Sequence, residues 1–268
     1  MQIGDDEMQR DIFLKRRNHS LMFFALLGAL TVGSVIITRY DVLKGFTSVF
    51  KAFVWGGSNF YPDAESMKHL PDILVKMRET VLMSIAASTS AAVVAFFLAL
   101  AGSRTTRLNS AFSIVARGIA SLFRNIPLVA WAMVLMLAFG QSDLTGYLAL
   151  FFGSLGFLAR AFMETIDEVS SHSVEALQAT GASYFHVVFQ AVLPGSMAQM
   201  VSWLLFMIDT NIHDATLVGI LTGTGIGFSF DLYYKSMYFH SASLVVIVIV
   251  ATIITIEMVS NYVRRLIL

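Results

Sequence analysis

A short polar run, residues 209–216, holds the side chains of this sequence that could do chemistry inside a membrane. Its candidate ligands for a solute are Asp209, Asn211, His213, Asp214 and Thr216. Ionisable residues are costly in lipid and tend to face a bundle interior or a water-filled cavity, so the run is typical of a translocation pathway. The alternative is an outer loop in which these side chains are simply solvated. Apolar residues resume directly at Leu217, which favours the pathway.

Glycines follow this run closely enough to break the backbone there. They stand at Gly219, Gly223, Gly225 and Gly227. Irregular backbone at membrane depth is tolerated only where protein or a cavity covers it. We therefore predict that the run ends a membrane span and leads into a broken or re-entrant segment. The predicted backbone hinges are Pro127, Pro194, Gly223, Gly225 and Gly227.

Two acids of the run, Asp209 and Asp214, could alternatively be the paired acids of an intramembrane enzyme. A helix places residues five apart on different faces, and no recognised catalytic motif accompanies them. The six histidines form neither a pair spaced by four nor a His-Glu-x-x-His motif, so no metal site is expected. We predict no catalytic residue and no cofactor in this chain.

A second polar run, from Glu164 to Gln190, is too hydrophilic to cross lipid and could bind a partner. Ser173 is a plausible N-cap, Glu175 would lie in the first turn, and Gly181 is a natural helix end. These signals predict a short helix. Its small residues, spaced by three, are Ala176, Ala179 and Ala182. Such a surface lets another element approach closely, although the helix could equally pack on its own bundle.

The composition shows which solvent surrounds the elements that carry these runs. The 268 residues are 56% hydrophobic and 13% charged, whereas soluble proteins have about 25% charged residues. So few charges cannot cover a soluble core, and we therefore expect lipid around an all-α integral membrane fold. A net charge of zero gives no excess of positive charge that would indicate nucleic-acid binding. Cysteine chemistry is excluded because the sequence has no cysteine.

Six stretches approach the length of a membrane helix, about 20 mostly apolar residues. They are residues 21–38, 80–101, 119–139, 144–163, 194–213 and 242–263. With six spans, three basic segments fall on one side, which the positive-inside rule assigns to the cytoplasm. Their basic residues are Arg10, Lys15, Arg16, Arg17, Arg104, Arg107, Arg117, Arg264 and Arg265.

We therefore expect both termini in the cytoplasm, with residues 1–20 as an N-terminal cytoplasmic segment and 21–268 as one transmembrane domain. The connection 39–79 is also basic, but the rule is weaker for long connections. Apolar residues recur in it at helical spacing, opposite Lys44 and Lys51. This pattern predicts a helix lying in the outer interface or, equally, one packed on neighbouring spans.

The second polar run resembles the signature loop of bacterial ABC importer permeases, Glu-Ala-Ala, three residues, Gly, nine residues, Ile, one residue, Leu-Pro. The matching positions are Glu175, Ala176, Gly181, Leu193 and Pro194, with Leu177 for the second Ala and Ala191 for Ile. The resemblance implies a type I importer permease fold with a coupling loop over about 164–193. It also implies that Glu175, Ala176, Ala179 and Gly181 couple to an ATPase subunit. The chain has no phosphate-binding loop, so ATP and Mg are expected on that partner.

The first polar run resembles the phosphonate-type permeases within this class. Matches are Asn211, Ile212, Ala215, Thr216 and Gly225-Ile226-Gly227, while His213 replaces the usual Arg. That histidine carries a weaker, pH-dependent charge. Arg124-Asn125-Ile126-Pro127 and Trp131 resemble a further motif of the family. Arg124 and Asn125 are accordingly candidates for the pathway, although an arginine here is more often an interface anchor.

The resemblance implies a homodimer with two ABC ATPase subunits and an extracytoplasmic substrate-binding protein, in the inner membrane of a bacterium. The solute would be a phosphonate, phosphite or hypophosphite, carried by alternating access. The same scaffold importing methionine or another amino acid is the alternative.

Overall fold

The computed structural model describes residues 3–107, 109–169 and 171–267, with side chains from residue 15 onward except that of Ser171. Arg10 of the predicted basic N-terminal cluster therefore lies outside the described side chains. Within these ranges all regular elements are helices, which confirms the predicted all-α fold. The chain divides into two compact units, Met1–Asn59 and Phe60–Leu268. The single transmembrane domain over 21–268 stays a prediction.

The first unit consists of helices α1 (Ile3–Thr38) and α2 (Val42–Asn59). The apolar part of α1, Lys15–Thr38, is long enough to cross a membrane and contains the predicted first span. Asp41 begins α2 by accepting a hydrogen bond on its Oδ1 from the backbone N–H of Lys44, at 2.9 Å. No residue of α2 is buried, and the interfacial position of this helix remains a prediction.

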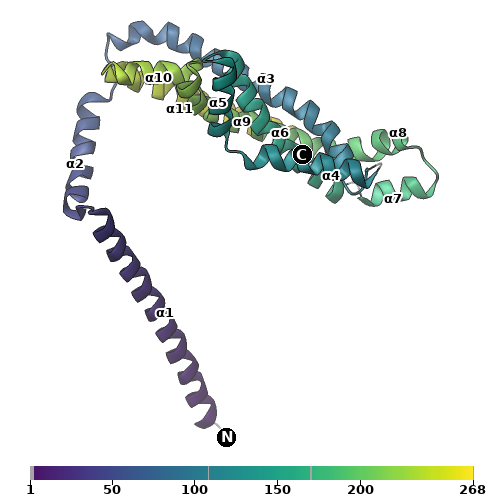
Figure 1. The fold of residues 1–268 in the computed structure, drawn as a ribbon, viewed down its shortest axis with the longest axis horizontal. Coiled ribbons are helices and arrows are strands. Elements are labelled where there is room, and N and C mark those ends of the chain that lie inside the picture. The colour runs from purple at the N-terminus through teal and green to yellow at the C-terminus, as the bar shows by residue number, and fades with distance from the viewer. Residues whose placement is uncertain (1–2, 108, 170, 268) are drawn as a thin grey trace. The chain divides into compact units, whose positions relative to one another are not determined.

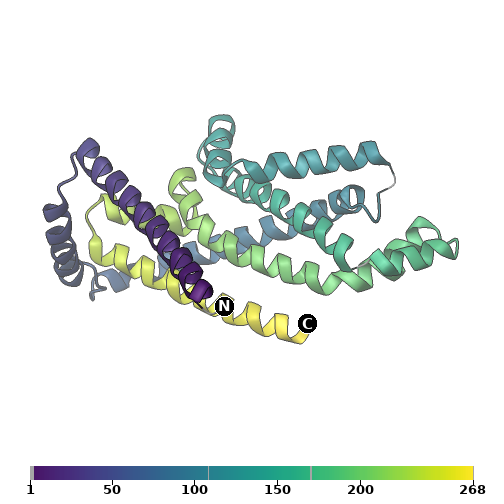
Figure 2. The same cartoon turned by 90° about the horizontal axis from the view of Figure 1, so that it is seen from below.

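The second unit is a bundle of helices shown from two directions in Figures 1 and 2. A 3₁₀ turn, Ser66–His69, leads into α3, and the helices are α3 (Leu70–Gly102), α4 (Ser110–Asn125), α5 (Leu128–Phe139), α6 (Asp143–Val169), α7 (Ser171–Ala179), α8 (Tyr184–Val187), α9 (Leu193–Thr222), α10 (Gly225–Lys235) and α11 (Phe239–Ile267). Both views place α7 and α8 at one end of the bundle and α10 at the other.

Helix α6 is central in this bundle, because α3, α4, α5 and α9 all pack against it. Small side chains make this packing close, as is usual for helices in lipid. A Cβ atom added to Gly156 of α6 would lie 2.3 Å from the backbone nitrogen of Arg124, so only glycine lets α4 approach here. Alanines on α3, at 91, 95 and 99, are fully buried in the same core.

The predicted third span, 119–139, is not one straight helix. The chain bends by 92° between α4 and α5, at Pro127. Proline cannot donate the next helical hydrogen bond and disfavours helical geometry in the residue before it. Ile126 is accordingly extended, with φ −88° and ψ 119°. Arg117, expected between the second and third spans, lies in α4, because that helix already begins at Ser110.

Among the residues that the structure describes, five helices are long and apolar enough to cross a membrane, and the bent pair of α4 and α5 makes up to six. The predicted boundaries of the fourth and fifth spans were wrong. Helix α6 continues to Val169, so residues 164–169 belong to a helix and not to a loop. Helix α9 continues to Thr222, nine residues beyond the predicted end at 213. Polar side chains on one face did not stop either helix, because the opposite face stays packed.

Candidate functional site

The predicted short helix exists as α7 and ends as the sequence indicated. Gly181 has φ +80°, the left-handed conformation that glycine adopts without cost. The N–H of Gly181 donates to the carbonyl of Gln178 at 3.0 Å, and that of Ala182 to the carbonyl of Leu177 at 3.2 Å. This pair of bonds is a Schellman motif, which satisfies the last carbonyls of a helix.

The predicted start of α7 was wrong. The helix already begins at Ser171, so Ser173 lies inside it and is not its N-cap. The run Ser170-Ser171-His172-Ser173 offers three serines that could each cap a helix, and the sequence does not distinguish among them. Glu175 consequently lies beyond the first turn, where the helix dipole acts on it less.

Helix α7 turns its apolar residues inward and its small residues outward. Val174 is 1% exposed, and Leu177 packs against the same core. Glu175, Ala176 and Ala179 are exposed. Of the predicted small-residue surface, Ala176 and Ala179 are therefore open in the isolated chain, whereas Ala182, beyond the end of α7, is half-buried and packs on the core of the bundle.

A π-helical turn, Val188–Val192, connects α8 to α9 in front of Pro194. The N–H of Leu193 donates to the carbonyl of Val188, five residues back. Pro194 follows in the first turn of α9, where its missing N–H costs little. The hinge predicted at Pro194 thus coincides with an irregular turn, and such turns occur frequently at functional sites.

The run 209–216 is a continuous part of α9 and neither an outer loop nor a broken segment. The helix rises by about 1.5 Å per residue, so the run lies about 24 to 35 Å from the start of α9. Its two faces differ. Asn211, Ile212 and Ala215 are buried, whereas His213 is exposed and Asp209, Asp214 and Thr216 are half-buried.

Asn211 is the internal cross-link of this region and lines no open surface in the structure. Its side-chain amide donates to Ser88 Oγ of α3 at 2.7 Å and to Ser154 Oγ of α6 at 2.6 Å. Ser84 Oγ donates to the backbone carbonyl of Asn211 at 3.2 Å. A buried amide must find such partners, and here they tie α3, α6 and α9 together.

Asp209 and Thr216 fit the predicted pathway better. Asp209 Oδ1 and Thr216 Oγ1 are enclosed by protein atoms and have no hydrogen-bond partner among the described residues. Unsatisfied polar atoms at membrane depth are expensive and point to a ligand, water or partner. Together with the exposed His213, they form the part of the predicted site that could meet a solute or a second chain.

The glycines after this run build a tight hairpin between α9 and α10. Gly223 and Gly225 have positive φ angles of 72° and 59°. A Cβ atom on Gly227 would lie 2.0 Å from the carbonyl oxygen of Thr216. Gly227 therefore lies in the first turn of α10 and serves close packing, and the hinge predicted there stays a prediction. Thr80 Oγ1 of α3 accepts the N–H of Ile226 at 2.8 Å and fixes the turn.

Arg124 and Asn125 end α4, and both are exposed at its surface. Asn125 Nδ2 donates to the carbonyl of Ser121 at 2.8 Å, one turn back. Aromatic rings pack beside the bend: Phe123 stacks on Trp131 with centroids 5.2 Å apart, and the tilted ring of Phe152 has its centroid 4.9 Å from that of Trp131. Trp131 thus packs within this cluster of rings, while the pathway roles of Arg124 and Asn125 stay predictions.

Several functional candidates could not be found by local pattern. Ser84, Ser88 and Thr80 look like ordinary small residues of a membrane helix, and their polar partners lie more than 120 positions away. Their spacing by four along α3 is the one signal that they share a face.

The sequence matches a protein family described as "Binding-protein-dependent transport system inner membrane component" over residues 91–267. Two curated relatives are similar to it. It is 30% identical over 244 residues to the "Phosphate-import permease protein PhnE" of Mycolicibacterium smegmatis, a match that covers 90% of this chain and 46% of that relative, so the chain spans less than half of it. It is 28% identical over 187 residues to the "Phosphite transport system permease protein PtxC" of Stutzerimonas stutzeri, covering 70% and 68%.

A solved structure of an amino acid ABC transporter has a similar fold. Its TM-score is 0.64 at 17% identity, over 76% of this chain and 98% of the solved one. At this identity the likeness shows the fold alone, and it confirms the predicted type I importer permease architecture.

Proposed function

Because the chain belongs to the binding-protein-dependent transport system inner membrane component family, we propose that it is the permease subunit of an ATP-driven importer. The open face of α7 carries this proposal. Ala176 and Ala179 are exposed there, and Gly181 ends the helix in open space, where an added Cβ atom would have nothing within 4 Å. A membrane protein with a small, preformed, uncovered helix of this kind offers a docking surface for a separate ATPase subunit.

We assign the α7 end of the bundle to the cytoplasm. The α3–α4 connection, with Arg104 and Arg107, is at this end, next to Arg117 and Arg160. Such an excess of arginine beside short loops marks the cytoplasmic side. ATP and Mg would bind to the partner, and an extracytoplasmic binding protein would meet the opposite end.

A second copy of the chain would complete the pathway. In α9 the exposed His213 lies one turn after the half-buried Asp209. A polar stripe on a membrane-spanning helix is costly against lipid, so it faces a protein partner or water. A homodimer would place the two polar stripes on either side of one shared translocation pathway. The ATPase subunits, by closing and opening, would move α7 and so open this pathway alternately to the two sides of the membrane.

We infer a phosphorus oxyanion as the solute. The two relatives are named for phosphate and phosphite, and His213 can supply a positive charge on the open face of α9. Phosphonate, phosphite and hypophosphite share the anionic oxygens that such a group would attract.

The test is uptake by the permease in proteoliposomes with its ATPase and its binding protein. We expect ATP-dependent uptake of phosphite or methylphosphonate and none of methionine. Uptake of methionine without uptake of either phosphorus compound would contradict the proposed solute and leave the transport role standing.

The coupling role is tested with Gly181→Asp, which should abolish uptake and ATPase association while the protein remains in the membrane. Gly140→Asp is a matched control, because Gly140 also has a positive φ, of 70°, and open space around it, but ends α5. Gly140→Asp carries at least as much backbone strain as Gly181→Asp, because Gly140, with ψ −169°, lies in a region that is almost exclusive to glycine. Normal uptake by Gly181→Asp, or equal loss of ATPase by both variants, would contradict the coupling role of α7.

A further inference from the structure

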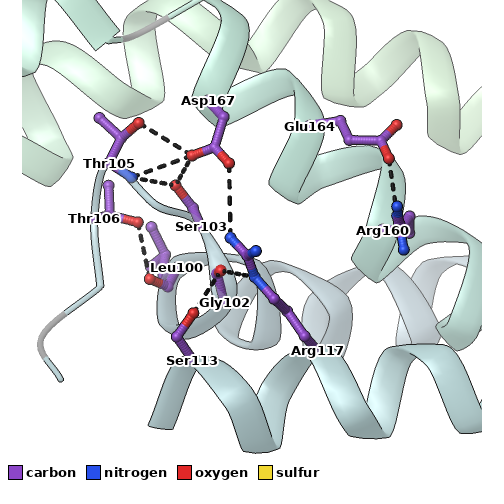
Figure 3. Close-up of polar contacts among 10 residues, drawn as sticks. All are labelled: Leu100, Gly102, Ser103, Thr105, Thr106, Ser113, Arg117, Arg160, Glu164 and Asp167. Atoms are coloured by element: carbon purple, nitrogen blue, oxygen red, sulfur yellow. Dashed lines mark hydrogen bonds and ion pairs between the residues drawn. The ribbon is translucent and has the colours of Figure 1, made fainter. Parts of the chain in front are cut away.

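One carboxylate at the α7 end binds the turn that follows α3. Asp167 belongs to the last turn of α6. Its Oδ1 accepts three hydrogen bonds, from Ser103 Oγ at 2.5 Å, from the N–H of Thr105 at 3.1 Å and from Thr105 Oγ1 at 3.0 Å. Figure 3 shows these contacts converging on one oxygen. A carboxylate with several donors makes charge-assisted bonds stronger than neutral ones.

Helix α4 joins the same network through Arg117. Arg117 Nε donates to the carbonyl of Gly102 at 2.7 Å, and Ser113 Oγ donates to the same oxygen at 3.0 Å. These bonds cap the C-terminal end of α3. Arg117 Nη2 lies 4.0 Å from Asp167 Oδ2, on the other side of the carboxylate. Asp167 therefore contacts the α3–α4 turn and helix α4, and Arg117 connects it to the last carbonyl of α3.

The backbone of α3 is also packed tightly on α6 at this point. A Cβ atom on Gly102 would lie 2.4 Å from Met163 Cε, so the side chain of Met163 packs directly on Gly102. Ser103 is fully buried, while the side chain of Asp167 is 28% exposed, beside a cavity of about 620 Å³ with polar walls. We call this set, Ser103, Thr105, Arg117 and Asp167, the Asp167 clasp.

The Asp167 clasp lies close to α7 along the chain. Asp167 lies four residues before the first residue of α7, so a displacement of α7 reaches it through the backbone of α6. The α3–α4 turn has no such covalent link to α7. Helix α3 in turn holds Ser84 and Ser88, which contact Asn211 of α9.

We propose that Asp167 is a positioning residue that fastens the α3–α4 turn to the end of α6, so that α3 and α4 move with α7. The inference rests on the proposed function, because it requires α7 to be the helix that an ATPase moves. The clasp stays closed throughout the transport cycle and acts as a rigid joint. Without it, movement of α7 bends α6 alone, and ATP is hydrolysed with little transport.

The experiment uses the complete importer in proteoliposomes and measures uptake and ATP hydrolysis in the same vesicles. Asp167→Ala removes all four contacts, and we expect uptake per ATP hydrolysed to fall about fivefold or more, because bonds to a charged carboxylate are strong. Asp167→Asn keeps an acceptor for Ser103 and Thr105 but loses the attraction for Arg117, so its loss should be smaller.

Glu164→Gln is the matched control. Glu164 is on the same helix and in the same cavity, and its ion pair with Arg160, at 2.8 Å, is exposed and contributes little. We expect wild-type coupling for this variant. Equal coupling in the wild type, Asp167→Ala and Glu164→Gln would overturn the proposal, as would an Asp167→Ala effect that only reduces the amount of assembled importer.

A double variant, Ser103→Cys with Asp167→Cys, distinguishes two causes of uncoupling, loss of the link between α6 and the α3–α4 turn and misfolding of the variant. The chain has no other cysteine, so a disulfide can form only between these touching positions or between chains. The reduced protein should be uncoupled like Asp167→Ala, and oxidation to the intrachain disulfide should restore uptake per ATP. An oxidised form that remains uncoupled would overturn the rigid joint. If the wild type itself shows no ATP-dependent uptake, the proposed function fails instead.

Discussion

The glycine that follows α7 and the glycines around the α9–α10 turn lie in different surroundings. At the α7 end, Gly181 stands in open space with exposed alanines beside it. At the α10 end, Gly219 and Gly227 are enclosed, and a Cβ atom on either would lie within 2.4 Å of a backbone oxygen. The first end leaves a surface uncovered, whereas the second uses the same residue type to close its own packing.

A glycine in a family motif can therefore be needed for either of two reasons, contact with a partner or packing within the chain. A glycine that only ends a helix can be replaced without disturbing the fold beyond local strain, so its importance lies with a partner. A glycine between two helices is required by the chain itself. Substitutions at the two ends should therefore fail in different assays.

The largest effect is expected from Gly227→Val. Its side chain would collide with the carbonyl of Thr216, and the α9–α10 hairpin would open at a cost of about 3 kcal/mol or more. The yield of monodisperse protein from membranes and its thermal midpoint in detergent measure this. Gly118→Val is the control, because Gly118 is helical and has nothing within 4 Å of its Cβ position. Equal stability of the two variants would show that the enclosed Gly227 is no more important for the fold than a glycine in open space.

Ala179→Trp at the other end should leave the thermal midpoint unchanged and abolish binding of the ATPase. Ala179 is exposed, so the added ring meets solvent in the isolated permease and a partner in the complex. Copurification of the ATPase is the measurement. Leu177→Trp reverses the pattern, because Leu177 packs in the core and its enlargement should lower stability by about 1–3 kcal/mol.

Asn211→Leu should have a moderate effect, about 1 kcal/mol, which is typical of a hydrogen bond between membrane helices. Ser88 and Ser154 each keep a bond to their own preceding turn, at 2.8 and 2.7 Å, so they are not left without partners. Thermal unfolding in detergent measures this loss. His213→Leu, on the open face of α9, should unfold like the wild type, and a larger loss there would show that His213 is structural.

The smallest effect is expected at Asp63, ahead of α3. A hydrogen bond from the N–H of Ser66, at 2.7 Å, holds the pKa of this carboxyl below its ordinary value of 3.8. Because the folded pKa is lowered, the contribution to stability is present above the ordinary pKa and is lost as the pH falls through the lowered one. The protection factor of the Ser66 amide, which is the exchange rate corrected for its intrinsic dependence on pH, should therefore fall on acidification below about pH 4. Asp63→Asn should show no such change in that range.

Local signals explain which parts of the fold were predictable. The end of α7 follows from Gly181 alone, because a left-handed residue is a requirement of the local backbone. The break at Pro127 follows from the proline and its effect on Ile126. Its angle of 92° does not, because it depends on Gly156 and the rings of Phe123 and Trp131 in space.

The candidate site was less predictable, because its contacts also join residues that are far apart in the sequence. The Asn211 amide meets serines 123 and 57 positions away, and Asp167 meets Ser103 across 64 positions. No periodicity within one helix carries that information. Polarity alone placed Asn211 on the pathway, whereas the packing of three helices places it in the interior.

The π-helical turn at Val188–Val192 constrains the length of the chain in related proteins. A π turn accommodates an extra residue within a helix, and one residue of an α-helix corresponds to a rotation of about 100°. Deleting one residue from this turn would swing α8 and the attached α7 around the axis of α9 while every contact within α9 survived. We expect homologues that bind the same kind of ATPase to vary in side chains between Gly181 and Pro194 but to keep the number of residues, and a gap there in an alignment to mark a changed partner.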